Sequence, residues 1–147
     1  MIPHGIHIDA DGTMYVSDRE NERVQIFDPE GELVGMWPGL NCPNNIVRDT
    51  DGYYYVAELG RNMQGPPGNK YIVRDAIHAR ITVRDPAGKP VAEWGARDVS
   101  GAGIFFAPHG IAIDSRGDLY VGEVVTAYSG GLAPPGLPTL HKFVRQR

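Results

Sequence analysis

A unit of sixteen residues occurs three times in this chain and constrains its fold more than any other feature. Each copy begins with a proline and ends with a carboxylate: residues 3–18 (PHGIHIDADGTMYVSD), 43–58 (PNNIVRDTDGYYYVAE) and 108–123 (PHGIAIDSRGDLYVGE). The step from proline to carboxylate is the same in every copy. Such internal similarity is typical of a repeat architecture built from one supersecondary unit.

The first copy predicts a meander of four short antiparallel strands. Residues 5–9 alternate in polarity, as a half-buried strand does, and 13–18 are rich in β-forming residues. Asp11-Gly12 supplies a tight turn between them. Residues 23–28 and 33–37 predict two further strands around the turn at 28–31.

The second and third copies repeat this pattern with longer loops. The second predicts strands at 45–48, 53–58, 80–84 and 91–94, with an insertion over 59–79. That insertion is either a functional lid or partner contact, or a tolerated surface loop. The third predicts strands at 110–114, 118–123 and 140–144, with a Gly/Pro-rich loop at 129–138 and no fourth strand.

Four-stranded repeats of this size predict an all-β fold of propeller blades. We place blade 1 at about 3–38, blade 2 at about 43–95 and an incomplete blade 3 at about 108–147, in a single domain. Closed propellers have about four to eight blades, so three are too few. Either a longer chain supplies the rest, or two copies form a six-bladed ring. We expect the homodimer, in which a partner strand completes blade 3.

The composition and net charge argue against several classes of function. The chain has 147 residues, 41% of them hydrophobic and 22% charged, as expected for a folded domain. A net charge of −4 without a dense basic run predicts no nucleic-acid partner. No apolar run predicts a membrane span and no signal peptide is recognised, which leaves the compartment open. A single cysteine, Cys42, excludes an internal disulfide and a cysteine-rich metal site.

Two stretches carry a resemblance to a known family. YVSDRENERVQIFD (15–28) and PHGIAIDSRGDLYVGE (108–123) resemble NHL repeats. More narrowly, they are similar to peptidyl-hydroxyglycine α-amidating lyase and its bacterial NHL-repeat relatives. The resemblance covers essentially the whole chain and corresponds to the C-terminal half of a six-bladed propeller. Because one fold serves many functions, it implies the architecture more strongly than the activity.

The resemblance implies a zinc ion in the central channel, held by three histidines that each follow a proline. His4 and His109 match two of these positions. The family's third zinc histidine, its catalytic tyrosine and a second arginine belong to blades with no counterpart here, so catalytic residues stay unassigned and enzyme activity stays open. Arg19, in DREN, matches a substrate-binding arginine. Asn44 lies in a blade that carries no zinc ligand in the family.

Geometry leaves two interpretations of the histidines open. The first strand of each blade lines the channel, so His4 and His109 converge near the axis, where imidazole suits Zn²⁺. A dimer would bring four imidazoles together. Alternatively, both rings bind only water or backbone groups in a metal-free channel. His7, His78 and His141 do not share this repeat position, and we do not expect them to be ligands.

The recurring carboxylates also have two interpretations. For Asp18 we expect a structural role in its loop. Glu58 and Glu123 either accept backbone N–H bonds or form an acidic ring at the channel mouth, suited to Ca²⁺ or proton transfer. Zinc ranks above calcium as the expected cofactor. Arg19, expected to be exposed, forms either a salt bridge with a neighbouring acid or a contact with a substrate carboxylate.

Two functions follow. The first is an enzyme or degenerate enzyme, a metal-dependent lyase-like propeller acting on a small carboxylate-bearing or peptide-like ligand. The second is a non-catalytic binding or assembly module that self-associates and presents loops 59–79 and 124–139 to a partner.

Overall fold

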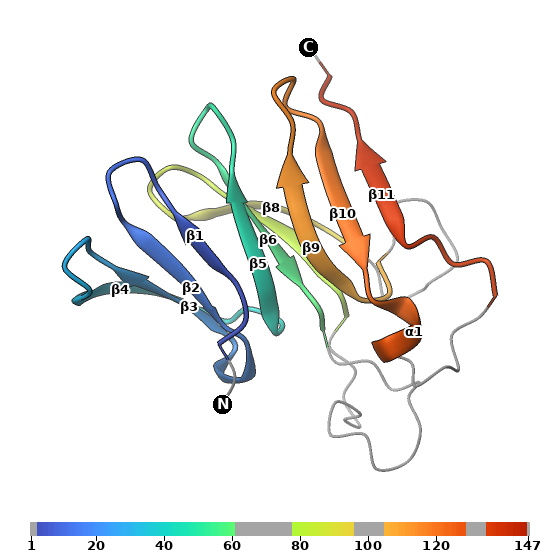
Figure 1. The fold of residues 1–147 in the computed structure, drawn as a ribbon, viewed down its shortest axis with the longest axis horizontal. Coiled ribbons are helices and arrows are strands. Elements are labelled where there is room, and N and C mark those ends of the chain that lie inside the picture. Colours follow the sequence, from blue (N-terminus) through green and yellow to red (C-terminus); the bar gives the residue numbers. More distant parts are fainter. Residues whose placement is uncertain (1–2, 61–77, 96–104, 129–134, 147) are drawn as a thin grey trace.

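Three antiparallel sheets stand side by side in the computed structural model, in the order of the chain (Figure 1). The structure describes residues 3–60, 78–95, 105–128 and 135–146. Within these ranges the sheets contain four, four and three strands, each paired with its sequence neighbours. The meanders that the sequence predicts are confirmed, and so is the all-β class.

The strand boundaries lie within about two residues of those expected from the sequence. Blade 1 consists of β1 (Ile6–Ile8), β2 (Met14–Asp18), β3 (Arg23–Phe27) and β4 (Leu33–Pro38). Blade 2 consists of β5 (Pro43–Arg48), β6 (Tyr54–Glu58), β7 (Arg80–Arg84) and β8 (Pro90–Trp94). Blade 3 consists of β9 (Pro108–Ile113), β10 (Leu119–Glu123) and β11 (Leu140–Phe143).

The core lies between the blades, face against face. One cluster joins Tyr15, Val24 and Trp37 of blade 1 to Ile46, Tyr54 and Val56 of blade 2. A second joins Ala57 and Ile81 of blade 2 to Ile111, Leu119 and Val121 of blade 3. Side chains alternate between the two faces of a strand, so each blade uses one face toward the preceding blade and the other toward the following one.

Two short helical segments were not expected from the sequence. A 3₁₀ turn, η1 (Arg19–Asn21), follows β2, and a single helical turn, α1 (Val125–Tyr128), follows β10. Segments of three or four residues are too short to show helical periodicity. In the described part of the chain, no helix has the length and apolar character needed to cross a bilayer. Most of the 59–79 insertion, whose role the sequence left open, lies outside the described residues.

Candidate functional site

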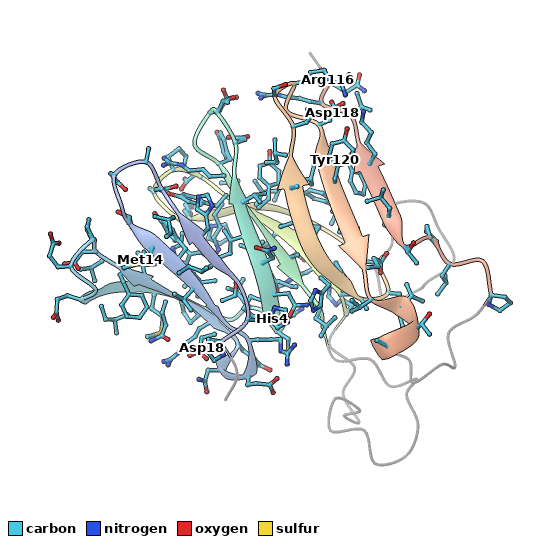
Figure 2. All side chains as sticks on the ribbon, viewed as in Figure 1. His4, Met14, Asp18, Arg116, Asp118 and Tyr120 are labelled. Carbon is cyan, nitrogen blue, oxygen red and sulfur yellow. The ribbon has the colours of Figure 1, made fainter. Side chains whose placement is uncertain are left out.

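Three side chains follow the proline that begins each copy of the unit, and they lie at the same end of the molecule. These are His4 before β1, Asn44 on β5 and His109 on β9. The rings of His4 and His109 meet edge to face, with centroids 4.5 Å apart. In Figure 2, His4 lies toward the lower end of the blades, near Asp18. The structure therefore brings together the two histidines that the repeat singled out.

Gly5 makes this convergence possible. A Cβ added at Gly5 would lie 2.3 Å from the carbonyl oxygen of Asn44, closer than any real side chain is found. The absence of a side chain lets the start of blade 1 approach the start of blade 2, as glycine does where backbones come close. The His4 ring then reaches that same carbonyl, with Nδ1 at 3.2 Å from the oxygen.

Asn44 connects the two histidine-bearing strands. Its carbonyl accepts from the His4 ring, and its Nδ2 donates to the carbonyl oxygen of Pro108, at 3.2 Å. Pro108 immediately precedes His109, so Asn44 is hydrogen-bonded to His4 itself and to the residue before His109. Asn44 is fully buried, and its Oδ1 has no hydrogen-bond partner among the described residues. No role was predicted for Asn44, although it occupies the same repeat position as His4 and His109.

The environment of His109 favours its neutral form. Donation from His4 Nδ1 to a carbonyl requires the proton on Nδ1, which leaves the Nε2 lone pair for a ligand or a proton. Burial lowers the pKa of His109, and the charges of His4 and Arg19 lower it further. A neutral ring is the form that binds a metal or acts as a base.

Arg19 is buried, contrary to the exposed position expected from the sequence. It is 8% exposed, because the η1 turn folds the side chain back against the protein. Its Nε and Nη2 both donate to Oε1 of Glu20, at 3.1 and 2.9 Å. The salt bridge with a neighbouring acid is therefore present. The positive charge of Arg19 is the smallest of the three causes that lower the pKa of His109.

Glu58 is deeply buried, with an exposed side-chain fraction of 0%. It accepts hydrogen bonds from the Asn41 backbone, from Arg80 Nε at 2.8 Å and from Thr82 Oγ1 at 2.6 Å. Burial raises its pKa, and these donors oppose that rise. Through these hydrogen bonds Glu58 connects β6 to β7 and to the loop before β5.

The equivalent carboxylates make contacts of the same kind. Glu123 accepts from the backbone N–H groups of Phe106 and Ala107 and pairs with the ring of His141. Asp18 accepts from Asn21 and from Arg23, the Arg23 bond being 2.7 Å long. In each copy the carboxylate ends the second strand and binds a cation or imidazole on the third. Glu58 and Glu123 thus accept backbone N–H bonds, one of the two roles considered for them, and Asp18 bonds within its own loop.

A polar cluster between blades 1 and 2 was not predicted from the sequence; Asp9 and Tyr54 are buried in it, whereas Arg48 is exposed. Asp9 accepts from His7 Nε2 at 2.9 Å, Arg48 Nη1 at 2.8 Å and Tyr54 Oη at 2.7 Å, and Tyr54 also bonds Tyr15 Oη. The repeat contained a signal for it. At the position of Arg48 the other copies carry Ile8 and Ile113. At the position of Tyr54 they carry Met14 and Leu119. A charged residue on an apolar face requires a buried partner.

Comparison with known proteins agrees with this architecture. The NHL repeat family model matches residues 1–27. The chain is 30% identical over 130 residues to human NHL repeat-containing protein 3, a match that covers 84% of this chain and 33% of that protein. It is 30% identical over 122 residues to rat peptidylglycine alpha-amidating monooxygenase, covering 76% of this chain and 12% of that protein. The chain thus spans about a third or less of these relatives.

Solved structures share the fold at low sequence identity. A protein of unknown function from Bacteroides caccae superposes with a TM-score of 0.65 at 16% identity, covering 93% of this chain and 43% of that one. Virginiamycin B lyase from Staphylococcus aureus gives a TM-score of 0.58 at 13% identity, covering 99% of this chain and 42% of that one. In both cases the match takes less than half of the larger protein.

Proposed function

Because this chain is an NHL-repeat β-propeller protein, we propose that the His4–His109 pair is the centre of a lyase-like channel site for a small, carboxylate-bearing ligand. The observation that supports this most is the edge contact of the two rings, 4.5 Å apart, from blades that are not neighbours. Two strands separated by a whole blade bring equivalent imidazoles together, and a buried asparagine holds both strand starts.

The donor set fits part of a zinc site. Catalytic zinc takes about three protein ligands and keeps one position open. His4 and His109 would supply two neutral nitrogen donors. Within the described ranges, no cluster of three or more His, Cys, Asp or Glu side chains is placed to hold a metal. Zinc binding by this pair therefore calls for a further ligand from outside the described part of one chain.

The lyase reaction that the family resemblance implies can be stated for these residues. An α-hydroxyglycine peptide loses its hydroxyl proton, the C–N bond breaks as the carbonyl forms, and the leaving nitrogen takes up a proton. The products are a peptide amide and glyoxylate. A neutral imidazole of the pair is the local group able to accept the hydroxyl proton. Bound zinc would stabilise negative charge on that oxygen.

Arg19 is the cation that we assign to the ligand carboxylate. Guanidinium groups bind carboxylates with two parallel hydrogen bonds, and Arg19 already binds one carboxylate, that of Glu20, through two nitrogens. A ligand carboxylate would therefore compete with Glu20 for this side chain.

Metal analysis tests the site directly. Protein purified without chelator is titrated with zinc at neutral pH, beside a His4→Ala, His109→Ala double variant and a His78→Ala control that leaves the pair intact. We expect the double variant to lose zinc affinity by more than about 100-fold, since even outer-shell changes cost about 10–100-fold. Absence of zinc binding by the wild-type chain, or equal binding by the double variant, would refute the metal site.

Activity is tested separately, as glyoxylate release from an α-hydroxyglycine peptide. Arg19→Ala should raise KM while zinc affinity stays unchanged, because its role is to bind the carboxylate. Arg116→Ala is the matched control, since Arg116 is exposed and lies at the opposite end of the blades (Figure 2). An unchanged KM in Arg19→Ala would exclude this role.

A further inference from the structure

Blade 1 exposes a face that blades 2 and 3 bury. The repeat equates Ile6 with Ile46 and Ile111, and these residues are 58%, 2% and 7% exposed. Ile8 is 57% exposed, and Met14 and Val16, its neighbours on the same face of the sheet, are half-buried.

The same face in blades 2 and 3 is closed. The counterparts of Val16 are Val56 and Val121, both 0% exposed. Their burial comes from the preceding blade, which packs against them in the two hydrophobic clusters. The outer face of blade 1 (Ile6, Ile8, Met14 and Val16) is therefore an interblade face for which the described residues provide no partner.

The face of blade 3 that points away from blade 2 has room for a further blade. Gly110 is the counterpart of Gly5, and a Cβ added at Gly5 would meet the Asn44 carbonyl at 2.3 Å. Among the described residues, nothing lies within 4 Å of such a Cβ at Gly110. Tyr120, the counterpart of the interblade Tyr15, lies half-buried on the outer side of blade 3. It is paired with Lys142 of β11, whose Nζ lies 5.3 Å from the centre of the ring. Blade 3 thus has the same glycine and tyrosine that blade 1 uses to pack against the blade that follows it.

We propose that two copies of this chain associate as a closed six-bladed ring, in which the outer face of blade 1 packs against blade 3 of the partner subunit. In this junction the carbonyl of His4 of the partner subunit approaches Gly110. The ring of His109 then donates to that carbonyl, as His4 does to Asn44 within one chain.

The second copy is the occupant because each chain has both halves of the junction. Two copies form two identical junctions, related by a twofold axis, and leave neither face open. Six blades fall within the range of about four to eight in which propellers close. Closure would also set the His4–His109 pairs of both subunits around one channel, which supplies metal ligands beyond those in the described part of a single chain.

The solution mass of the chain is the primary test, by light scattering and sedimentation velocity at micromolar concentrations. The expected species has twice the 16.1 kDa chain mass. This measurement does not depend on metal or activity, so its result is independent of the lyase proposal.

Three variants locate the interface. Ile6→Lys places a charge on the exposed face of blade 1, and Gly110→Ala adds a Cβ where the partner's carbonyl would lie. Both sites are open within the described part of a single chain, so circular dichroism should be unchanged, while the dimer dissociation constant rises at least about tenfold. Val91→Lys is the control: Val91 is also exposed, at 51%, but lies on the outermost strand of blade 2. It should remain dimeric.

Three results would overturn the proposal. One is a monomer at every micromolar concentration tested. Another is a dimer that Ile6→Lys and Gly110→Ala leave unchanged. The third is a series of growing oligomers, because a head-to-tail junction that does not close makes open filaments.

Discussion

Replacing Gly5 with alanine tests the contact that positions the histidine pair. The added Cβ would lie 2.3 Å from the Asn44 carbonyl oxygen, whereas ordinary contacts begin at 3.4 Å. The start of blade 1 must therefore move by about 1 Å, because a backbone atom on the facing strand cannot rotate away as a side chain can. The movement also lengthens the 3.2 Å hydrogen bond from the His4 ring.

The size of the effect follows from three contributions. Overpacking of this kind costs about 1–3 kcal/mol. Loss of one hydrogen bond adds about 0.5–1.5 kcal/mol. Alanine returns about 0.4–1 kcal/mol through lower entropy of the unfolded chain. We expect a net loss of about 1–3.5 kcal/mol in the free energy of unfolding.

Urea unfolding at one fixed protein concentration measures this loss, with zinc titration of the folded variant beside it. At a slope of about 2 kcal/mol per molar urea, the midpoint should fall by about 0.5–1.7 M. Gly35→Ala is the control, since its Cβ would meet the Ile26 side chain at 3.4 Å, an ordinary contact. If Gly5→Ala unfolds at the wild-type midpoint and binds zinc equally well, Gly5 does not hold the pair together.

Three further predictions follow from the site and its supports. The lowered pKa of His109 means that the unfolded chain binds a proton more readily, so stability should fall as pH drops through about 6.5; an equal pH dependence in His109→Gln would contradict this. Asp9→Asn should cost about 2–4 kcal/mol in urea unfolding, because Arg48 and Tyr54 lose a charged acceptor; a loss below about 0.5 kcal/mol would show the cluster to be dispensable. Glu58→Gln should cost about 1–3 kcal/mol by the same assay, since its amide group faces donors; a more stable variant would mean that burying the charge outweighs these bonds.

The arrangement of strands was readable from the sequence because the repeat is exact in spacing. Equal steps from proline to carboxylate put corresponding residues at corresponding strand positions, and alternation then assigns each residue to a face. For that reason His4 and His109 could be paired from the sequence alone. Their separation by a whole blade in sequence did not matter, since the repeat fixes both positions.

The environment of each side chain depended on residues far apart in sequence. Arg19 was expected at the surface, and the η1 turn buries it beside Glu20. Asn44 had no predicted role, yet its contacts to His4 and Pro108 span forty and sixty-four residues. Burial, partners and pKa are properties of the neighbourhood that packing creates, and local pattern does not specify them.

The repeat by itself thus determined the all-β class, the blade register and the convergence of two histidines, because these depend only on period and spacing. The tertiary structure decided how closely the blades meet: Gly5 lies against the Asn44 carbonyl of the next blade, whereas no described residue would contact a Cβ added at Gly110. That difference depends on which backbone atoms come within van der Waals distance, and distances between blades exist only once the chain has packed.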